Sequence, residues 1–148
     1  MTEIGFYQLL STPLERALPK LLERALKGGY RAVVMAGSAE RVALLDAALW
    51  TYDEASFLPH GTAQDGMAER QPIYLTALDE NPNGANMLVL TEGVQPADLS
   101  GFERCLDIFD GRDETALRAA RERWKALKAA GHSLTYWEQT PSGWEKKA

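Results

Sequence analysis

The sequence predicts an α/β fold, a three-layer α/β/α Rossmann-like sandwich with a mostly parallel central sheet. Short apolar runs rich in β-branched residues alternate with amphipathic helical segments, which is the order typical of parallel sheets with helical crossovers. The run RAVVMA is apolar at nearly every position, as in a strand covered on both faces. The chain has 148 residues, 45% of them hydrophobic and 25% charged, which suits one compact domain.

The first strand and the first helix are predicted from the N-terminal segment. Residues 4–10 form an apolar run with two aromatic side chains and are expected to be a strand. Thr12, Pro13 and Glu15 have the spacing of a capping box, with Thr12 as the N-cap and Pro13 as the first helical residue. Pro19 lies inside this helix, where it removes a backbone donor, so a kink or a restart is expected there.

The middle of the chain predicts a second helix between further strands. Residues 31–36 are the second strand, and Ser38 is the expected N-cap of a helix that extends to Trp50. Residues 73–77 and 87–91 are two further apolar strands, separated by a turn-forming segment rich in Asp, Asn, Pro and Gly.

The last third predicts a long helix between two strands. A short helical piece is expected around residues 96–102, before a strand at 105–109. Asp113 is the expected N-cap of a helix that runs from about 114 to 130, and residues 134–137 form one last strand. Residues 1–140 are thus expected to form one domain. Residues 141–148 form a tail that either packs on the sheet or remains disordered.

Charge and cysteine content exclude several classes of function. The 16 Lys and Arg residues against 21 Asp and Glu residues give a net charge of −5, which argues against binding nucleic acid through the whole surface. Cys105 is the single cysteine, so an internal disulfide and a multi-thiolate metal site are excluded. No secretory signal and no apolar stretch of about 20 residues is present, so a cytoplasmic protein without a membrane segment is expected.

Motifs for phosphate binding and catalysis are also missing from the sequence. The first strand is followed by LLSTPLE, which has neither G-x-G-x-x-G nor the P-loop pattern, so no cofactor is expected. His60 in FLPHG is interpreted as a residue that holds a turn rather than as a general base. His132 follows a helix stop and is expected to satisfy terminal carbonyls, and Cys105 is expected in the core. We therefore predict no catalytic residue and no metal ligand.

The late helix carries the clearest functional signal. Between residues 118 and 128 there are five basic residues and one acidic residue. At about 100° per residue, one stripe contains four of the cations and an indole. Its members are Arg118, Arg121, Trp124, Lys125 and Lys128. The opposite side, expected to lie on the sheet, contains Ala116, Ala119, Ala126, Leu127 and Ala130. Arg123 falls among these small residues and must snorkel or be paired.

The stripe suits an acidic ligand with an apolar end. An exposed Trp124 beside four cations would fit a peptide whose acidic end terminates in an apolar side chain and a free carboxylate. The alternative interpretation is that the stripe is an ordinary solvated surface without a binding function. Single-stranded nucleic acid fits less well, because the rest of the surface is acidic and only one aromatic is interleaved.

Two separated motifs resemble a known family. The first is LDAALW at 45–50 followed by FLPHG at 57–61, which is similar to an LD-x-x-LW…F-x-PH signature. The second is ARERWK at 120–125 followed by an Ala-Gly pair, which is similar to an A-R-E-R-[YW]-K…AG segment. With the Phe-Tyr pair of the first strand, these motifs resemble the chi subunit of bacterial DNA polymerase III.

The resemblance implies a noncatalytic accessory subunit of the clamp loader, acting in DNA replication. Chi proteins bind the acidic C-terminal tail of single-strand DNA-binding protein, which ends in proline and phenylalanine. Through another surface they bind the psi subunit, so that contact with DNA is only indirect. A nucleotide-binding Rossmann-like protein and a direct binder of single-stranded DNA remain the alternatives.

The matched motifs also imply roles for individual residues. For the tail they imply apolar walls from Trp50 and Trp124, with Arg121 on the terminal carboxylate and Lys125 on the preceding acidic residues. Lys128 and Arg118 join this set because of their place on the stripe. The residues of the second surface, for psi or for a helicase that competes with psi, are Phe57 as anchor with Leu58, Pro59 and His60. Leu117 departs from the family pattern, since some members have a basic residue there.

Overall fold

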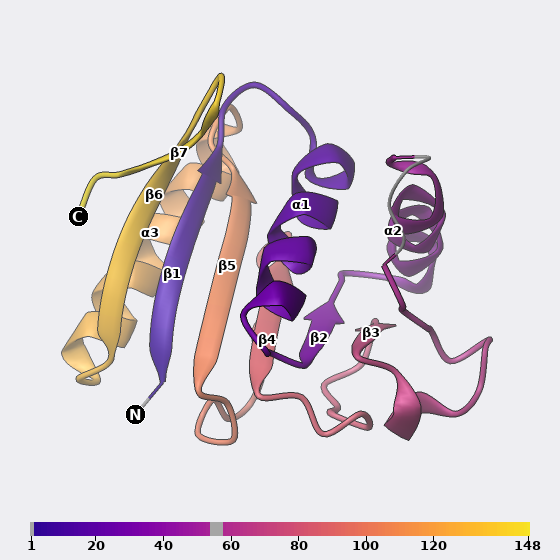
Figure 1. Cartoon of the computed structure of the whole chain (residues 1–148). Coiled ribbons are helices and arrows are strands. Elements are labelled where there is room, and N and C mark those ends of the chain that lie inside the picture. The colour runs from indigo at the N-terminus through magenta and orange to yellow at the C-terminus, as the bar shows by residue number, and fades with distance from the viewer. Residues whose placement is uncertain (1, 54–57) are drawn as a thin grey trace.

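The computed structural model describes residues 2–53 and 58–148, which contain one seven-stranded sheet in the order β3-β2-β4-β5-β1-β6-β7 (Figure 1). The strands are β1 (Glu3–Leu9), β2 (Ala32–Met35), β3 (Ile73–Thr76), β4 (Met87–Thr91), β5 (Arg104–Asp110), β6 (Ser133–Thr140) and β7 (Gly143–Lys146). The helices are α1 (Leu14–Lys27), α2 (Ala39–Thr51), α3 (Glu114–Ala129) and the short 3-10 helix η1 (Ala68–Arg70). Neighbouring strands are parallel except for β6 and β7.

The helices divide between the two faces of the sheet. Helices α1 and α2 cover one face and α3 covers the other (Figure 1). Along β1 successive side chains alternate between these two cores, with Phe6 on the side of α3 and Tyr7 on the side of α1. The predicted three-layer α/β/α sandwich with a mostly parallel sheet is therefore confirmed.

The C-terminal segment is part of the sheet. Strand β7 pairs antiparallel with β6, and the pairing continues beyond it, where the N–H of Lys147 donates to the carbonyl oxygen of Tyr136 at 2.8 Å. The ring of Trp144 lies edge-on to Tyr7 with 5.0 Å between the centroids, on the face that α1 covers. Of the two alternatives for residues 141–148, the structure therefore has the packed one.

The start of α1 differs from the predicted capping box. Pro13 is the N-cap and makes no capping bond, and Thr12 lies one residue before it. The side chain of Gln139 on β6 binds this turn instead. Its oxygen accepts the N–H groups of Leu10, Ser11 and Thr12 at 2.9, 2.9 and 3.2 Å, and its nitrogen donates to the Thr12 hydroxyl at 2.6 Å. A residue far away in the sequence thus fixes the turn that leads into α1.

Two further local predictions concern Pro19 and residues 96–102. Of the kink or restart predicted at Pro19, the restart is absent, because α1 continues through this residue as one element with Pro19 on its buried face. Residues 96–102 are not helical, because the carboxylate of Asp98 accepts both the N–H and the hydroxyl of Ser100 at 2.9 Å. Such local bonds compete with helix formation. The other predicted strands and helices lie within a few residues of the observed ones.

In the described part of the chain, no helix has the length and apolarity needed to cross a membrane.

We expect Gln139→Ala to lower the free energy of unfolding by about 1–3 kcal/mol, because it leaves several N–H groups of the β1–α1 turn without their acceptor. Urea denaturation followed by circular dichroism measures this change. The matched control is Gln64→Ala at an exposed position, where a change within about 0.5 kcal/mol is expected. Equal effects of the two substitutions would contradict an anchoring role for Gln139.

Candidate functional site

Helix α3 is attached to the sheet through an apolar face and a capped N-terminus. The carboxylate of Asp113 accepts the N–H groups of Thr115 and Ala116 at 2.9 and 3.4 Å, as predicted for this N-cap. The ring of Trp124 packs edge-on against Phe6 and Tyr136, with centroid distances of 5.4 and 5.7 Å. The other residues of α3 in this core are Leu117, Ala120 and Leu127.

A buried ion pair adds a polar attachment of α3 to β5. The guanidinium of Arg123 donates to both carboxylate oxygens of Asp107, at 2.7 and 2.9 Å. The side chains are 13% and 2% exposed, so the pair lies inside the protein. Burial raises the pKa of Asp107, and the charge and hydrogen bonds of Arg123 act in the opposite direction. Arg123 is therefore paired, which was one of the two states predicted for it.

The rotation of α3 differs from the prediction. Trp124 is half-buried against the sheet rather than exposed beside the cations, whereas Ala119, Ala126 and Ala130 are exposed. The assignment of the buried side was therefore wrong, apart from Leu127 and the half-buried Ala116. The physical reason is that Trp124 buries more apolar surface than the alanines do, while Arg123 has a carboxylate partner at the sheet.

The predicted cations form one exposed group on α3, which we call the basic face. It consists of Arg118, Arg121, Lys125 and Lys128. Lys125 lies 3.7 Å from the carboxylate of Glu122, and both side chains are largely exposed. Such an exposed pair contributes little, so this lysine remains accessible to an external carboxylate.

Tyr136 on β6 is a residue of this region that the sequence analysis missed. Its ring lies against Trp124, and its hydroxyl donates to Gln8. Burial raises the pKa of Tyr136, while the positive charge of Arg121 lowers it. Arg121, Trp124 and Tyr136 thus form an aromatic and cationic group at the junction of α3 and β6. The alternation of the last predicted strand was the available signal, because it places Tyr136 and Trp137 on opposite faces.

Trp50 lies elsewhere. It belongs to α2, and the sheet separates α2 from α3 (Figure 1). Trp50 therefore does not form one pocket with Trp124 and Arg121, which corrects its assignment to the tail site. Its indole is 54% exposed, and its ring lies 4.6 Å from that of His60. The structure thus brings Trp50 together with the second predicted group of residues.

The histidine of this second group is a buried support. The Nδ1 atom of His60 lies 2.6 Å from the carbonyl oxygen of Leu58. Its Nε2 atom lies 3.0 Å from the carboxylate of Asp46, at ion-pair distance but without the alignment of a hydrogen bond. Leu58 is buried and Pro59 half-buried. Phe57, the predicted anchor, lies outside the described residues. His60 therefore holds the segment against α2 beneath Trp50 rather than presenting its own ring.

Helix α2 also has apolar side chains on the side that points away from the core. Ala43, Leu44, Ala47 and Trp50 are exposed at helical spacing, and Leu44 is 52% exposed. We call these four residues the apolar strip. The sequence analysis named only Trp50 from it, although apolar residues on the side of a helix opposite its buried leucines are themselves a sign that a partner covers that side.

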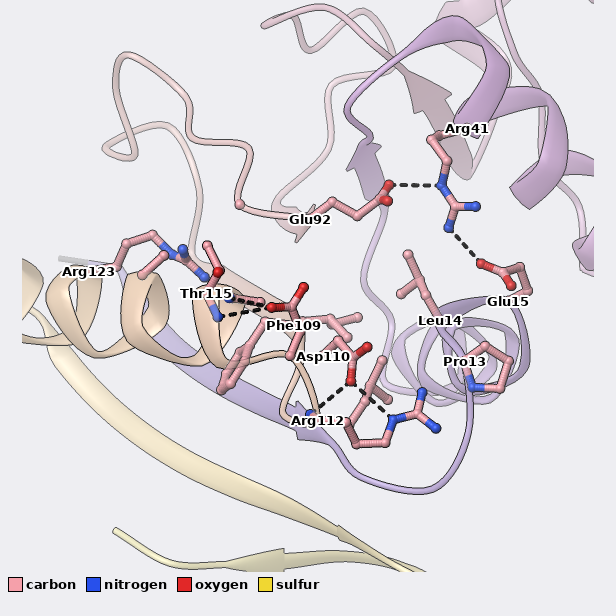
Figure 2. Close-up of a pocket in the computed structure, with 16 residues that line it drawn as sticks. Pro13, Leu14, Glu15, Arg41, Glu92, Phe109, Asp110, Arg112, Thr115 and Arg123 are labelled. Carbon is pink, nitrogen blue, oxygen red and sulfur yellow. Dashed lines mark hydrogen bonds and ion pairs between the residues drawn. The ribbon is translucent and has the colours of Figure 1, made fainter.

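A crevice of about 510 Å³ lies at the carboxyl ends of β1 and β5, between the beginnings of α1 and α3 (Figure 2). Ligands of open α/β sheets commonly bind at this place. The arginines that line it are Arg41, Arg112 and Arg123. Arg41 binds Glu15 and Glu92 at 2.6 and 3.0 Å, and Arg112 binds Asp110 at 3.1 Å. Glu15, Glu92, Asp110 and Asp113 line the crevice as well and repel an anion, so the crevice is poorly suited to a phosphate group.

Cys105 and His132, the other candidate residues from the sequence, have structural roles. Cys105 is buried in β5, and burial raises the pKa of its thiol far enough to keep it protonated. The N–H of His132, rather than its imidazole, donates to the carbonyl oxygen of Leu127 at the end of α3, at 3.2 Å. Among residues 2–53 and 58–148, no group of three or more His, Cys, Asp or Glu side chains is arranged to hold a metal ion.

Comparison with known proteins identifies the family of this chain. Residues 1–135 match the family described as DNA polymerase III chi subunit, HolC. A Rickettsia prowazekii protein, named a probable DNA polymerase III subunit chi, is 29% identical over 68% of this chain and 59% of its own length. The DNA polymerase III subunits chi of Escherichia coli and Pseudomonas aeruginosa are each 24% identical, over 82% and 90% of this chain and 82% and 94% of their own lengths. The chain therefore belongs to the family of chi subunits of DNA polymerase III.

Proposed function

We propose that this chain is a noncatalytic subunit of the polymerase assembly that links single-strand DNA-binding protein to the clamp loader. The basic face of α3 binds the acidic C-terminal tail of single-strand DNA-binding protein, and the apolar strip of α2 binds the psi subunit. The observation that carries the proposal is the group of exposed cations beside Trp124 and Tyr136, within a protein whose net charge is −5.

Each part of the basic face suits one part of the tail. Arg121 presents a planar guanidinium, which binds a terminal carboxylate through two parallel hydrogen bonds. The half-buried rings of Trp124 and Tyr136 beside it offer apolar contact for the last side chain of the peptide. Lys125, with Lys128 and Arg118 on the same face, attracts the acidic residues that precede it.

The charge distribution favours this peptide over DNA. Direct binding of single-stranded DNA is strongest where a positive groove follows the backbone and several aromatic side chains stack on bases. Here the basic face occupies a single helix of a protein whose net charge is −5. DNA is therefore reached only indirectly, through the protein that coats it.

The second surface is suited to an apolar partner. Leu44 and Trp50 are exposed, and the His60 segment supports the indole from below. We assign the strip to psi, or to a helicase that competes with psi, with Phe57 as a further predicted contact. Because the strip and the basic face lie on opposite sides of the sheet, both partners can be bound at the same time.

Tethering by this arrangement depends on many weak contacts. A short acidic peptide on exposed cations is expected to bind with a Kd in the micromolar range, which corresponds to roughly −8 kcal/mol. Single-strand DNA-binding protein on coated DNA offers many tails, so local concentration raises the overall affinity without a large interface.

We expect Arg121→Ala to weaken binding of the C-terminal peptide of single-strand DNA-binding protein by about 10- to 150-fold, as charge-assisted hydrogen bonds contribute about 1.5–3 kcal/mol. Isothermal titration calorimetry measures the change, and the peptide without its final phenylalanine tests the apolar end. The control is Arg112→Ala, an exposed arginine next to Asp110 at the carboxyl edge. Unchanged affinity of a folded Arg121→Ala variant would contradict the proposed site.

We expect Trp50→Ala to reduce binding of psi by about 30-fold or more, because a central aromatic anchor of an interface typically contributes at least about 2 kcal/mol. Affinity for the acidic peptide should stay the same, since α2, to which Trp50 belongs, lies across the sheet from α3. Leu78→Ala, which removes another exposed apolar side chain, is the control. Loss of peptide binding together with intact psi binding would reverse the two assignments.

A further inference from the structure

The antiparallel hairpin of β6 and β7 places two adjacent lysines on opposite faces of the sheet. Lys146 is the cross-strand partner of Trp137. One residue further, the N–H of Lys147 donates to the carbonyl oxygen of Tyr136 at 2.8 Å. Side chains of directly opposite residues point to the same face, so Lys146 shares the face of Trp137. Lys147 pairs with Glu145, whose cross-strand partner Glu138 is two residues from Tyr136, so Lys147 shares the face of Tyr136.

The ring contacts identify these two faces. The ring of Trp137 stacks on Tyr7 at 6.1 Å, on the side of α1 and α2. The ring of Tyr136 lies against Trp124 of α3 at 5.7 Å. Lys147 is therefore on the face of α3 and next to Tyr136, whereas Lys146 is on the other face.

We propose that the hairpin is part of the peptide-binding surface and that Lys147 binds an acidic side chain of the bound peptide. The inference rests on the proposed function of the basic face. Tyr136 lies between Lys147, on the neighbouring strand, and Trp124 on α3, so the surface extends from α3 across β6 to β7. An extended acidic peptide with its end at Arg121 then has one cation, Arg121, on one side of Tyr136 and another, Lys147, on the other, with Glu145 and Glu138 next to Lys147.

The partner that Lys147 has within the protein is exchangeable. Its ammonium lies 3.4 Å from the carboxylate of Glu145, with side chains 43% and 60% exposed, and such pairs contribute little. Glu145 is also directly opposite Glu138, and like charges at this position repel. A carboxylate of the peptide can therefore replace Glu145 at Lys147. Removing the charge of Glu145 should free the lysine and strengthen peptide binding.

The test compares Lys147→Ala with Lys146→Ala, two substitutions of the same chemistry at adjacent positions. Calorimetric titration with the C-terminal peptide of single-strand DNA-binding protein should show about two- to fivefold weaker binding for Lys147→Ala and unchanged binding for Lys146→Ala. Glu145→Gln should bind about twofold tighter, an increase that a merely structural role of the hairpin would not produce. Thermal melting establishes that each variant is folded.

The outcomes separate this inference from the function on which it rests. Absence of peptide binding by the unaltered protein would overturn both. Binding that Arg121→Ala weakens, but that Lys147→Ala and Lys146→Ala leave unchanged or weaken equally, would overturn only the role of the hairpin. Weaker binding by Lys147→Ala alone would support it.

Discussion

The arrangement of the proposed tail-binding surface depends on the buried ion pair between Asp107 and Arg123. Burying the unpaired carboxylate of Asp107 inside the protein would cost several kcal/mol of folding free energy, so α3 must bring Arg123 to β5. Together with Trp124, which packs on Phe6 and Tyr136, this pair leaves α3 with one rotation relative to the sheet. The basic face points outward in consequence, because its residues occupy the remaining part of the helix circumference.

The Asp107–Arg123 pair also shows which features of the structure could not be predicted from the sequence. Strands β1 to β6, the three long helices and the Asp113 cap follow from local patterns, because each depends on the spacing of residues that are close together in the sequence. The rotation of α3 does not follow, because Arg123 finds its partner on another element. Trp50 was misplaced for the same reason, as its motif says nothing about which face a helix covers. Tyr136 and Gln139 act through contacts that join distant segments of the chain.

The two proposed surfaces differ in chemistry as well as in place. On α3 the cations are long and exposed, as suits a contact that forms and breaks readily and weakens with salt. On α2 the exposed residues of the apolar strip suit a lasting interface between subunits. In the proposed function, the sheet therefore separates a transient contact from a durable one.

The position of β1 has a consequence for how the chain folds during synthesis. This strand is made first, yet both of its neighbours, β5 and β6, belong to the last third of the chain. Its backbone therefore has no sheet partner until almost the whole protein has left the ribosome. Contacts between such distant segments form slowly, and an apolar strand that waits for them is exposed to wrong pairing. The strand order thus predicts that β2, β3 and β4 can pair with one another first and that β1 joins the sheet late.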